Sequence, residues 1–93
     1  KPIVIMTPLH RLGELNIPEC KYKGEGAPLK DYVNIIREVA EYYSLPVCDL
    51  YATSGIQPEI PEILETYIPD GLHPNDEGHK LMAARLTSFL KSL

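Results

Sequence analysis

Two short apolar runs, with one long amphipathic stretch between them, limit most strongly what this 93-residue chain can fold into. Residues 3–6 read IVIM and show no polar alternation, which is typical of a strand that is buried on both faces. Residues 45–51 read LPVCDLY and form the second predicted strand. Strands of this kind occur in parallel sheets whose two faces are covered by helices. The two runs therefore predict part of an α/β fold.

The stretch between the runs predicts the helix that joins two parallel strands. Apolar residues recur there at helical spacing while charged residues fill the opposite side, and a proline stands near the first turn. The apolar positions are Leu29, Tyr32, Val33, Ile36, Val39, Ala40 and Tyr43. Strand, helix and strand form one βαβ unit, for which a right-handed crossover is expected. Residues 13–28 before the helix predict a surface loop, because the G-E-G of KYKGEGAP lacks the preceding strand of a phosphate loop.

The last part of the chain predicts a long connection and a closing helix. The connection contains three prolines, with one short helical turn expected around residues 62–66. The final helix is expected to begin near Asn75 or Asp76, with an apolar face made of Met82, Leu86, Phe89, Leu90 and Leu93.

Two strands and two long helices cannot form an independent parallel sheet. Residues 1–93 are therefore expected to be the C-terminal part of a single α/β domain whose N-terminal half is absent. The alternative is that two copies pair through their open strand edges as a homodimer.

Composition and charge exclude several classes of partner. The net charge is -4, and the nine Lys and Arg residues are dispersed, so a nucleic-acid or anionic membrane surface is not expected. No apolar stretch approaches the ~20 residues of a transmembrane helix. Cys20 and Cys48 have neither the number nor the spacing of a disulfide framework or a zinc site, so both are expected to be free thiols.

The sequence DGLHPNDEGH holds the candidate catalytic residues. Asp70 and His73 lie on a loop that leads into the last helix, at the edge of the sheet where open α/β folds bind ligands. Imidazole can take and return a proton near neutral pH, and a nearby carboxylate can fix its tautomer. Pro74 keeps His73 in extended backbone, Asn75 can cap the helix, and Gly78 leaves room for a close neighbour.

This segment resembles the last block of the SGNH, or GDSL, hydrolases, in which D-x-x-H-P precedes the C-terminal helix and supplies two members of a Ser-His-Asp triad. The order of the other elements is also similar, from a strand ending in TP to the VCDLY strand and the SGI loop. The resemblance implies a three-layer, flavodoxin-like fold, of which this chain is the C-terminal half. It also implies that Asp70 orients the imidazole, and that His73 is the general base and then the general acid.

The nucleophile is not found among these residues. The family's G-D-S block does not occur here, nor do the glycine and asparagine blocks that complete its oxyanion hole, and Ser44, Ser54, Ser88 and Ser92 lack the context. Ser54, which precedes a glycine, is most simply a turn residue. The resemblance thus implies a fragment of a serine esterase that acts on a small-molecule carboxylic ester without a cofactor, and that is inactive by itself. Neither the kind of ester, whether acetylated sugar, lipid or another, nor the localisation follows from the sequence.

Other interpretations remain open. The chain could be a non-enzymatic α/β interaction module that assembles through its strand edges and uses DGLHPN as a capping loop. A small-anion site at the start of the last helix is disfavoured by the acidic Asp76 and Glu77. His79 could be imagined as a metal ligand with His73, but the spacing fits no common zinc or calcium pattern, and no metal is expected.

Four further residues lie at or just after the ends of the predicted strands, and the roles of the first two are open. His10 and Arg11 come after the TP that ends the first strand, and they could line the cleft or make a surface contact. Asp49 and Tyr51 are assigned to hydrogen bonding and packing at the end of the second strand.

Overall fold

A computed structural model describes residues 3–13 and 29–93 of the chain. The helices and strands in these ranges follow one another in the order β1 (Ile5–Met6), α1 (Leu29–Tyr42), β2 (Val47–Cys48), α2 (Leu50–Thr53), α3 (Pro61–Tyr67) and α4 (Asp76–Lys91). The KYKGEGAP loop and Cys20 lie outside the described residues.

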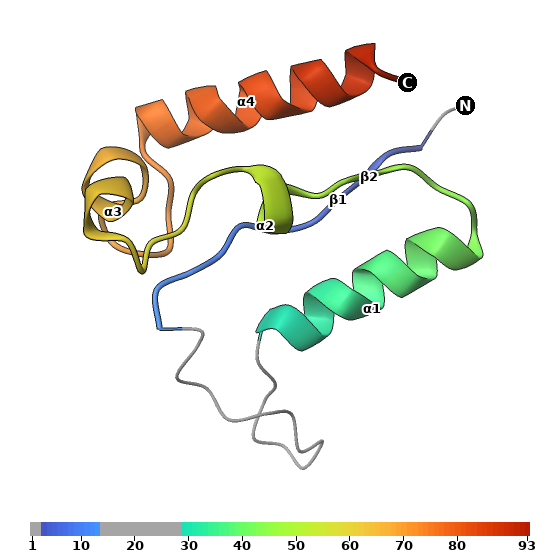
Figure 1. Ribbon diagram of the computed structural model, residues 1–93, viewed down its shortest axis with the longest axis horizontal. Coiled ribbons are helices and arrows are strands. Elements are labelled where there is room, and N and C mark those ends of the chain that lie inside the picture. Colours follow the sequence, from blue (N-terminus) through green and yellow to red (C-terminus); the bar gives the residue numbers. More distant parts are fainter. Residues whose placement is uncertain (1–2, 14–28) are drawn as a thin grey trace.

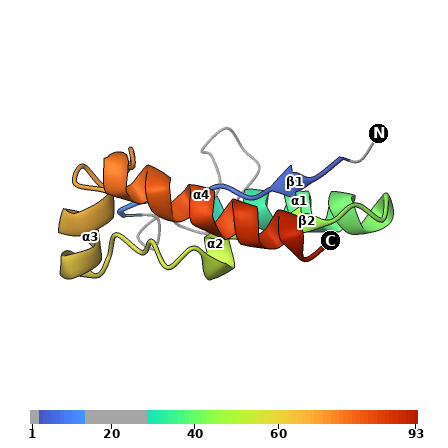
Figure 2. The same ribbon diagram turned by 90° about the horizontal axis from the view of Figure 1, so that it is seen from above.

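The two strands pair in parallel, with Ile5 opposite Val47 and Met6 opposite Cys48. The ladder continues beyond β1, because the N–H of Thr7 donates to the carbonyl of Cys48 over 3.2 Å. Because α1 joins the two strands, this pairing confirms the predicted βαβ unit. Figure 1 shows α1 and α4 on opposite sides of the strand pair, and in Figure 2, seen from above, α4 passes in front of α1. The observed architecture is a mixed one of helices and a short, two-stranded parallel sheet.

The second strand is shorter than the sequence predicted. Leu50 and Tyr51 lie in α2, so the prediction of one strand that runs through residue 51 was wrong. Asp49 is the cause, because its side chain accepts the N–H of Ala52 over 3.2 Å and caps the helical turn. Leu50 is buried in this helical turn. A short apolar run in the sequence does not distinguish a buried strand from a buried helical turn.

The first strand is not covered on both faces. Ile3 is 57% exposed and Met6 is 42% exposed, which contradicts the expectation of a fully buried run. Within residues 3–13 and 29–93, β1 has a neighbour along only one edge, because the sheet consists of β1 and β2. The other edge and the adjoining apolar side chains are therefore open.

Helix α1 confirms the predicted amphipathic helix, but it carries a second apolar stripe. Val33 and Ala40 are buried, as expected. Tyr32 and Val39, which the spacing assigned to the buried side, are about half exposed, and so is Ile35. The helix therefore covers the sheet with one stripe and leaves another apolar stripe at the surface.

The long connection after α2 is packed rather than loose. Ile56, Pro58 and Ile68 are fully buried. The connection contains α3, which confirms the predicted helical turn, and α3 packs against α4 (Figure 1). This packing fixes the segment that leads directly into Asp70. None of the helices in the described parts of the chain is long and apolar enough to cross a membrane.

The start of α4 agrees with the sequence-based expectation. Asn75 is the N-cap, and its Oδ1 accepts the N–H of Gly78 over 2.9 Å. Gly78 is buried, and a Cβ at this position would collide with the carbonyl oxygen of Tyr67 and with Pro74. The close neighbour predicted for Gly78 is thus the end of α3.

Candidate functional site

Asp70 and His73 are in direct contact. The Asp70 Oδ2 atom lies 2.7 Å from Nδ1 of His73. The other carboxylate oxygen, Oδ1, accepts the backbone N–H groups of Leu72 and His73 over 2.8 and 2.7 Å. The loop thus folds around the carboxylate, and the carboxylate in turn holds the imidazole.

Gly71 allows this tight loop to form. The backbone angle φ of Gly71 is +79°, a conformation that residues with a side chain rarely adopt. Its N–H donates to the carbonyl of Ile68, and its carbonyl accepts the N–H of Leu12, each over 2.8 Å. A Cβ on Gly71 would collide with the Leu12 side chain. The segment that follows β1 therefore packs directly on the loop that carries the two candidate residues.

The other end of the loop is tied to α3. The N–H of Asn75 donates to the carbonyl of Tyr67 over 2.9 Å, and its side-chain amide donates to the carbonyl of Thr66 over 3.0 Å. Asn75 therefore caps α4 and also joins it to α3. We refer to residues 70–75, held in this way at both ends, as the dyad loop.

The hydrogen bonds show which groups of the loop donate to Asp70. The pKa of Asp70 lies well below its usual range, chiefly because of the backbone N–H of His73, then the His73 side chain and the N–H of Leu72. An ionised Asp70 only accepts hydrogen bonds, so Nδ1 of His73 carries a proton, and in the neutral imidazole the free lone pair is then on Nε2. The His73 side chain is 76% exposed, so Nε2 is accessible to a reacting group.

A hollow of about 420 Å³ lies beside the dyad loop. It is formed by the segment after β1, the start of α1, the dyad loop and the first turns of α4. The lining residues are Pro8, Leu9, His10, Arg11, Leu29, Leu72, Pro74, His79 and Met82. His10 and Arg11 line this hollow, whereas Asp70 and His73 are not among its lining residues. We call this space the dyad hollow.

A partly buried polar network lies at the carboxyl ends of the two strands. Arg37 binds the Asp49 carboxylate through Nε and Nη2, with N–O distances of 2.9 and 2.8 Å. Thr7 donates to the same carboxylate over 3.0 Å and is itself 2% exposed. The hydrogen-bonding role expected for Asp49 is confirmed, whereas Arg37 was assigned to the solvent side of its helix and was missed. The sequence did contain a signal for this network: Thr7 and Asp49 each follow a strand, and parallel strands end at the same edge of a sheet.

The other candidate groups have structural roles. Cys48 is a free, buried thiol, as expected, and burial followed by the charge of Asp49 raises its pKa. Ser54 is buried, and its Oγ accepts the N–H of Ile56 over 3.1 Å, in keeping with the predicted turn. In the described ranges, no three His, Cys, Asp or Glu side chains come together in a way that could hold a metal ion.

The fold and the site define a class of protein: a helix-covered parallel strand pair with a hydrogen-bonded acid and histidine before its last helix. The family model described as GDSL-like Lipase/Acylhydrolase matches residues 1–86. The chain belongs to this family, which confirms the resemblance recognised in the DGLHPNDEGH segment.

Solved structures of similar proteins extend well beyond this chain. One crystal structure is 40% identical, with a TM-score of 0.81 over 99% of this chain and 43% of its own. A protein from Lactobacillus plantarum is 29% identical, with a TM-score of 0.82 over 98% of this chain and 44% of its own. The chain thus spans less than half the length of both. Comparison with the curated proteins gave no match.

Proposed function

We propose that this chain carries the acid and the base of a Ser-His-Asp triad in a hydrolase that cleaves carboxylic esters. The observation that carries the proposal is the 2.7 Å contact between Asp70 Oδ2 and His73 Nδ1, which directs Nε2 away from the carboxylate. Membership of the GDSL-like lipase/acylhydrolase family supports the reaction type. The chemistry needs an activated hydroxyl, a proton shuttle and oxyanion donors, and protein groups can supply all three without a cofactor.

In the proposed mechanism, Nε2 of His73 takes the proton of a serine hydroxyl as that oxygen attacks the ester carbonyl. The imidazolium is stabilised by ionised Asp70. It returns the proton to the alkoxide oxygen when the C–O bond of the tetrahedral intermediate breaks, which releases the alcohol and leaves an acyl-serine. A water molecule then repeats the sequence and releases the carboxylic acid. The serine and the oxyanion donors are proposed to lie outside these 93 residues.

The proposed setting is a three-layer, flavodoxin-like domain of which residues 1–93 form the C-terminal part. Two observations support it. The helices α1 and α4 lie on opposite sides of the strand pair (Figure 1), and the matched solved structures continue for more than half of their length outside the match. We propose that the N-terminal half of the same domain covers the open edge of β1.

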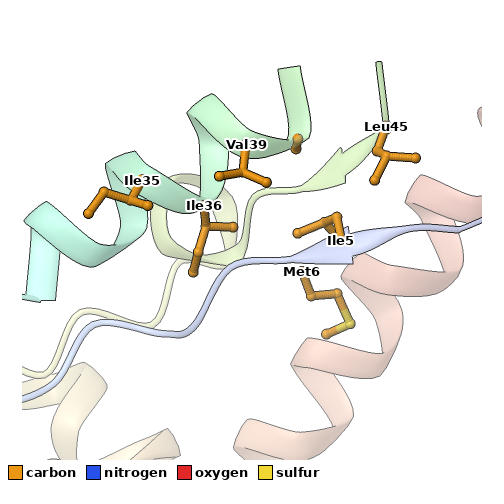
Figure 3. A pocket seen from close by; sticks show the side chains of 7 residues that line it. Ile5, Met6, Ile35, Ile36, Val39 and Leu45 are labelled. Carbon is orange, nitrogen blue, oxygen red and sulfur yellow. The ribbon is translucent and has the colours of Figure 1, made fainter. Parts of the chain in front are cut away.

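A groove between α1 and β1 marks the surface that such a half would cover. It has a volume of about 320 Å³, and Figure 3 shows the side chains that line it, on α1, on β1 and before β2. The groove is lined by Ile5, Met6, Ile35, Ile36, Val39, Ala40 and Leu45, all of which are apolar. The same exposed apolar surface favours the second candidate function, a non-enzymatic module that assembles through this face.

The proposal can be tested with a serine-directed fluorophosphonate on a polypeptide that extends this chain at its N-terminus. Rapid covalent labelling is expected, because His73 activates the serine, and His73→Ala should slow it strongly. Lys91→Ala is the control, since Lys91 lies at the other end of α4 and is exposed. Equal labelling rates in the parent polypeptide and in His73→Ala would contradict the proposed triad.

A further inference from the structure

The peptide that joins Gly71 to Leu72 is held at both ends. Its carbonyl, which belongs to Gly71, accepts the N–H of Leu12 over 2.8 Å. Its N–H, which belongs to Leu72, donates to Oδ1 of Asp70 over 2.8 Å. A trans peptide is planar, and its C=O and N–H bonds point in opposite directions. Because Leu12 fixes the direction of the carbonyl, it also fixes the direction of the N–H that Asp70 accepts.

The two hydrogen bonds of this peptide also strengthen each other. A carbonyl that accepts a hydrogen bond polarises its amide, so the N–H of the same amide becomes a better donor, by ~10–30% per bond in a chain. The pKa of Asp70 is lowered chiefly by the N–H and the side chain of His73, and then by the N–H of Leu72. Leu12 therefore supports the ionised form of Asp70 through one intervening peptide.

Leu12 is itself held in place by Glu59. The N–H of the next residue, Gly13, donates to Oε2 of Glu59 over 2.8 Å. Glu59 lies in a turn, where its N–H donates to the side-chain oxygen of Gln57 over 3.1 Å. Pro58, between these two residues, is fully buried and anchors the turn. The segment after β1 is thus tied on one side to a packed turn and on the other side to the dyad loop.

A neighbouring amide provides a reference within the same loop. The N–H of His73 donates to the same Oδ1 atom of Asp70, over 2.7 Å. This N–H belongs to the following peptide, whose carbonyl is that of Leu72, whereas Leu12 bonds to the carbonyl of Gly71. An effect that starts at Leu12 should therefore reach the Leu72 amide before it reaches the His73 amide.

We propose that Leu12 and Glu59 are positioning residues for the acid of the dyad. Glu59 holds the segment after β1, the N–H of Leu12 orients the Gly71–Leu72 peptide, and this peptide directs its N–H to Asp70. Neither Leu12 nor Glu59 is assigned a contact with substrate, because both act through Asp70. The inference rests on the proposed ester hydrolysis for the catalytic role of Asp70.

Amide hydrogen exchange in the 93-residue chain tests this inference without turnover. Glu59→Ala removes the acceptor of the Gly13 N–H, so exchange at Leu12 and at Leu72 should both become roughly fivefold faster, as for the loss of one exposed hydrogen bond to a charged group. Exchange at His73 should change less than exchange at Leu72. Glu59→Gln keeps an acceptor oxygen and should restore most of the protection.

A matched control and a direct variant complete the test. Glu65→Ala removes the same charge from an exposed position on α3 and should leave these amides unchanged. Replacement of the Leu12 amide by an ester, through chemical synthesis, deletes the N–H and keeps the side chain. Exchange at Leu72 should then rise further than in Glu59→Ala. The pKa of Asp70, measured by a ¹³C titration of its carboxyl group, should move upward in the ester variant.

The inference is wrong if Glu59→Ala or the ester variant leaves exchange at Leu72 unchanged, or if Glu65→Ala has the same effect as Glu59→Ala. It is also wrong if Leu72 and His73 respond equally, because a loop that only loosens as a whole would speed both amides alike. A selective response of Leu72, together with no fluorophosphonate labelling of the extended polypeptide, would support the positioning of Asp70 while rejecting the serine-hydrolase proposal.

Discussion

The two residues of the dyad have different tasks, and their substitution should separate these tasks. In an extended, active polypeptide, His73→Ala removes the proton shuttle, so kcat should fall by about 10⁴- to 10⁶-fold, the range of triad removals in serine proteases. Asp70→Asn keeps the shape of the loop but loses the charge that stabilises the imidazolium, so a smaller loss in kcat is expected. Initial rates with a chromogenic acetate ester measure both. An unchanged kcat in His73→Ala would remove it from the mechanism.

The carboxylate of Asp70 should remain ionised in acid. Its hydrogen bonds to His73 and Leu72 depress the pKa, so it should titrate below the ~3.9 of an unperturbed aspartate. This lowered pKa makes the stability of the fold depend on pH. The depressed pKa stabilises the fold above the unfolded-state pKa, and this contribution is lost as the pH falls toward the folded-state pKa. A ¹³C NMR titration of the carboxyl group measures this directly, with Asp70→Asn to assign the signal. A midpoint at or above the ordinary value would contradict the observed hydrogen bonds.

At the scale of elements, the helices were predictable and the strand ends were not. The amphipathic spacing located α1, and the Asn75 cap located the start of α4, because both signals are local in sequence. The end of β2 was missed because Asp49 turns the chain into α2, and the roles of Arg37 and Thr7 depend on contacts between distant segments. Local sequence likewise gave no sign of the second apolar stripe on α1.

The dyad loop yields a prediction at this scale. Gly71→Ala places a methyl group against Leu12 at a positive φ, so we expect a loss of about 1–3 kcal/mol in unfolding free energy. Urea unfolding gives the size of the loss. In a Leu12→Gly background, which removes the colliding Cβ, Gly71→Ala should cost less but still lower the stability, because the collision is relieved while the backbone strain stays. Full recovery would show that strain at Gly71 contributes nothing.

At the scale of the whole molecule, the dyad loop and the open face belong to different regions. The dyad loop is held by contacts within the described chain, to Leu12 and to α3. The exposed apolar stripe and the groove lie on α1 and β1. The 93-residue chain is therefore expected to keep the Asp70–His73 contact by itself and yet to hydrolyse a chromogenic acetate ester no faster than free imidazole. Saturable hydrolysis that a fluorophosphonate abolishes would place the nucleophile within these residues.

The open face also determines how the 93-residue chain behaves in solution. Ile35 and Val39 are each about half exposed on α1, and Met6 on β1 lines the same groove (Figure 3). Exposed apolar surface next to an unpaired strand edge promotes association, so sedimentation equilibrium at micromolar concentration should give a mass above the 10.5 kDa of one chain. Val39→Asp should shift the distribution toward the monomer, because a charge buried in such an interface is costly. Ser88→Asp, an exposed position on α4, is the control that should leave the mass unchanged. A well-folded monomer with no co-purified partner would show that this face needs no cover, and the proposed assembly with an N-terminal half would lose its physical basis.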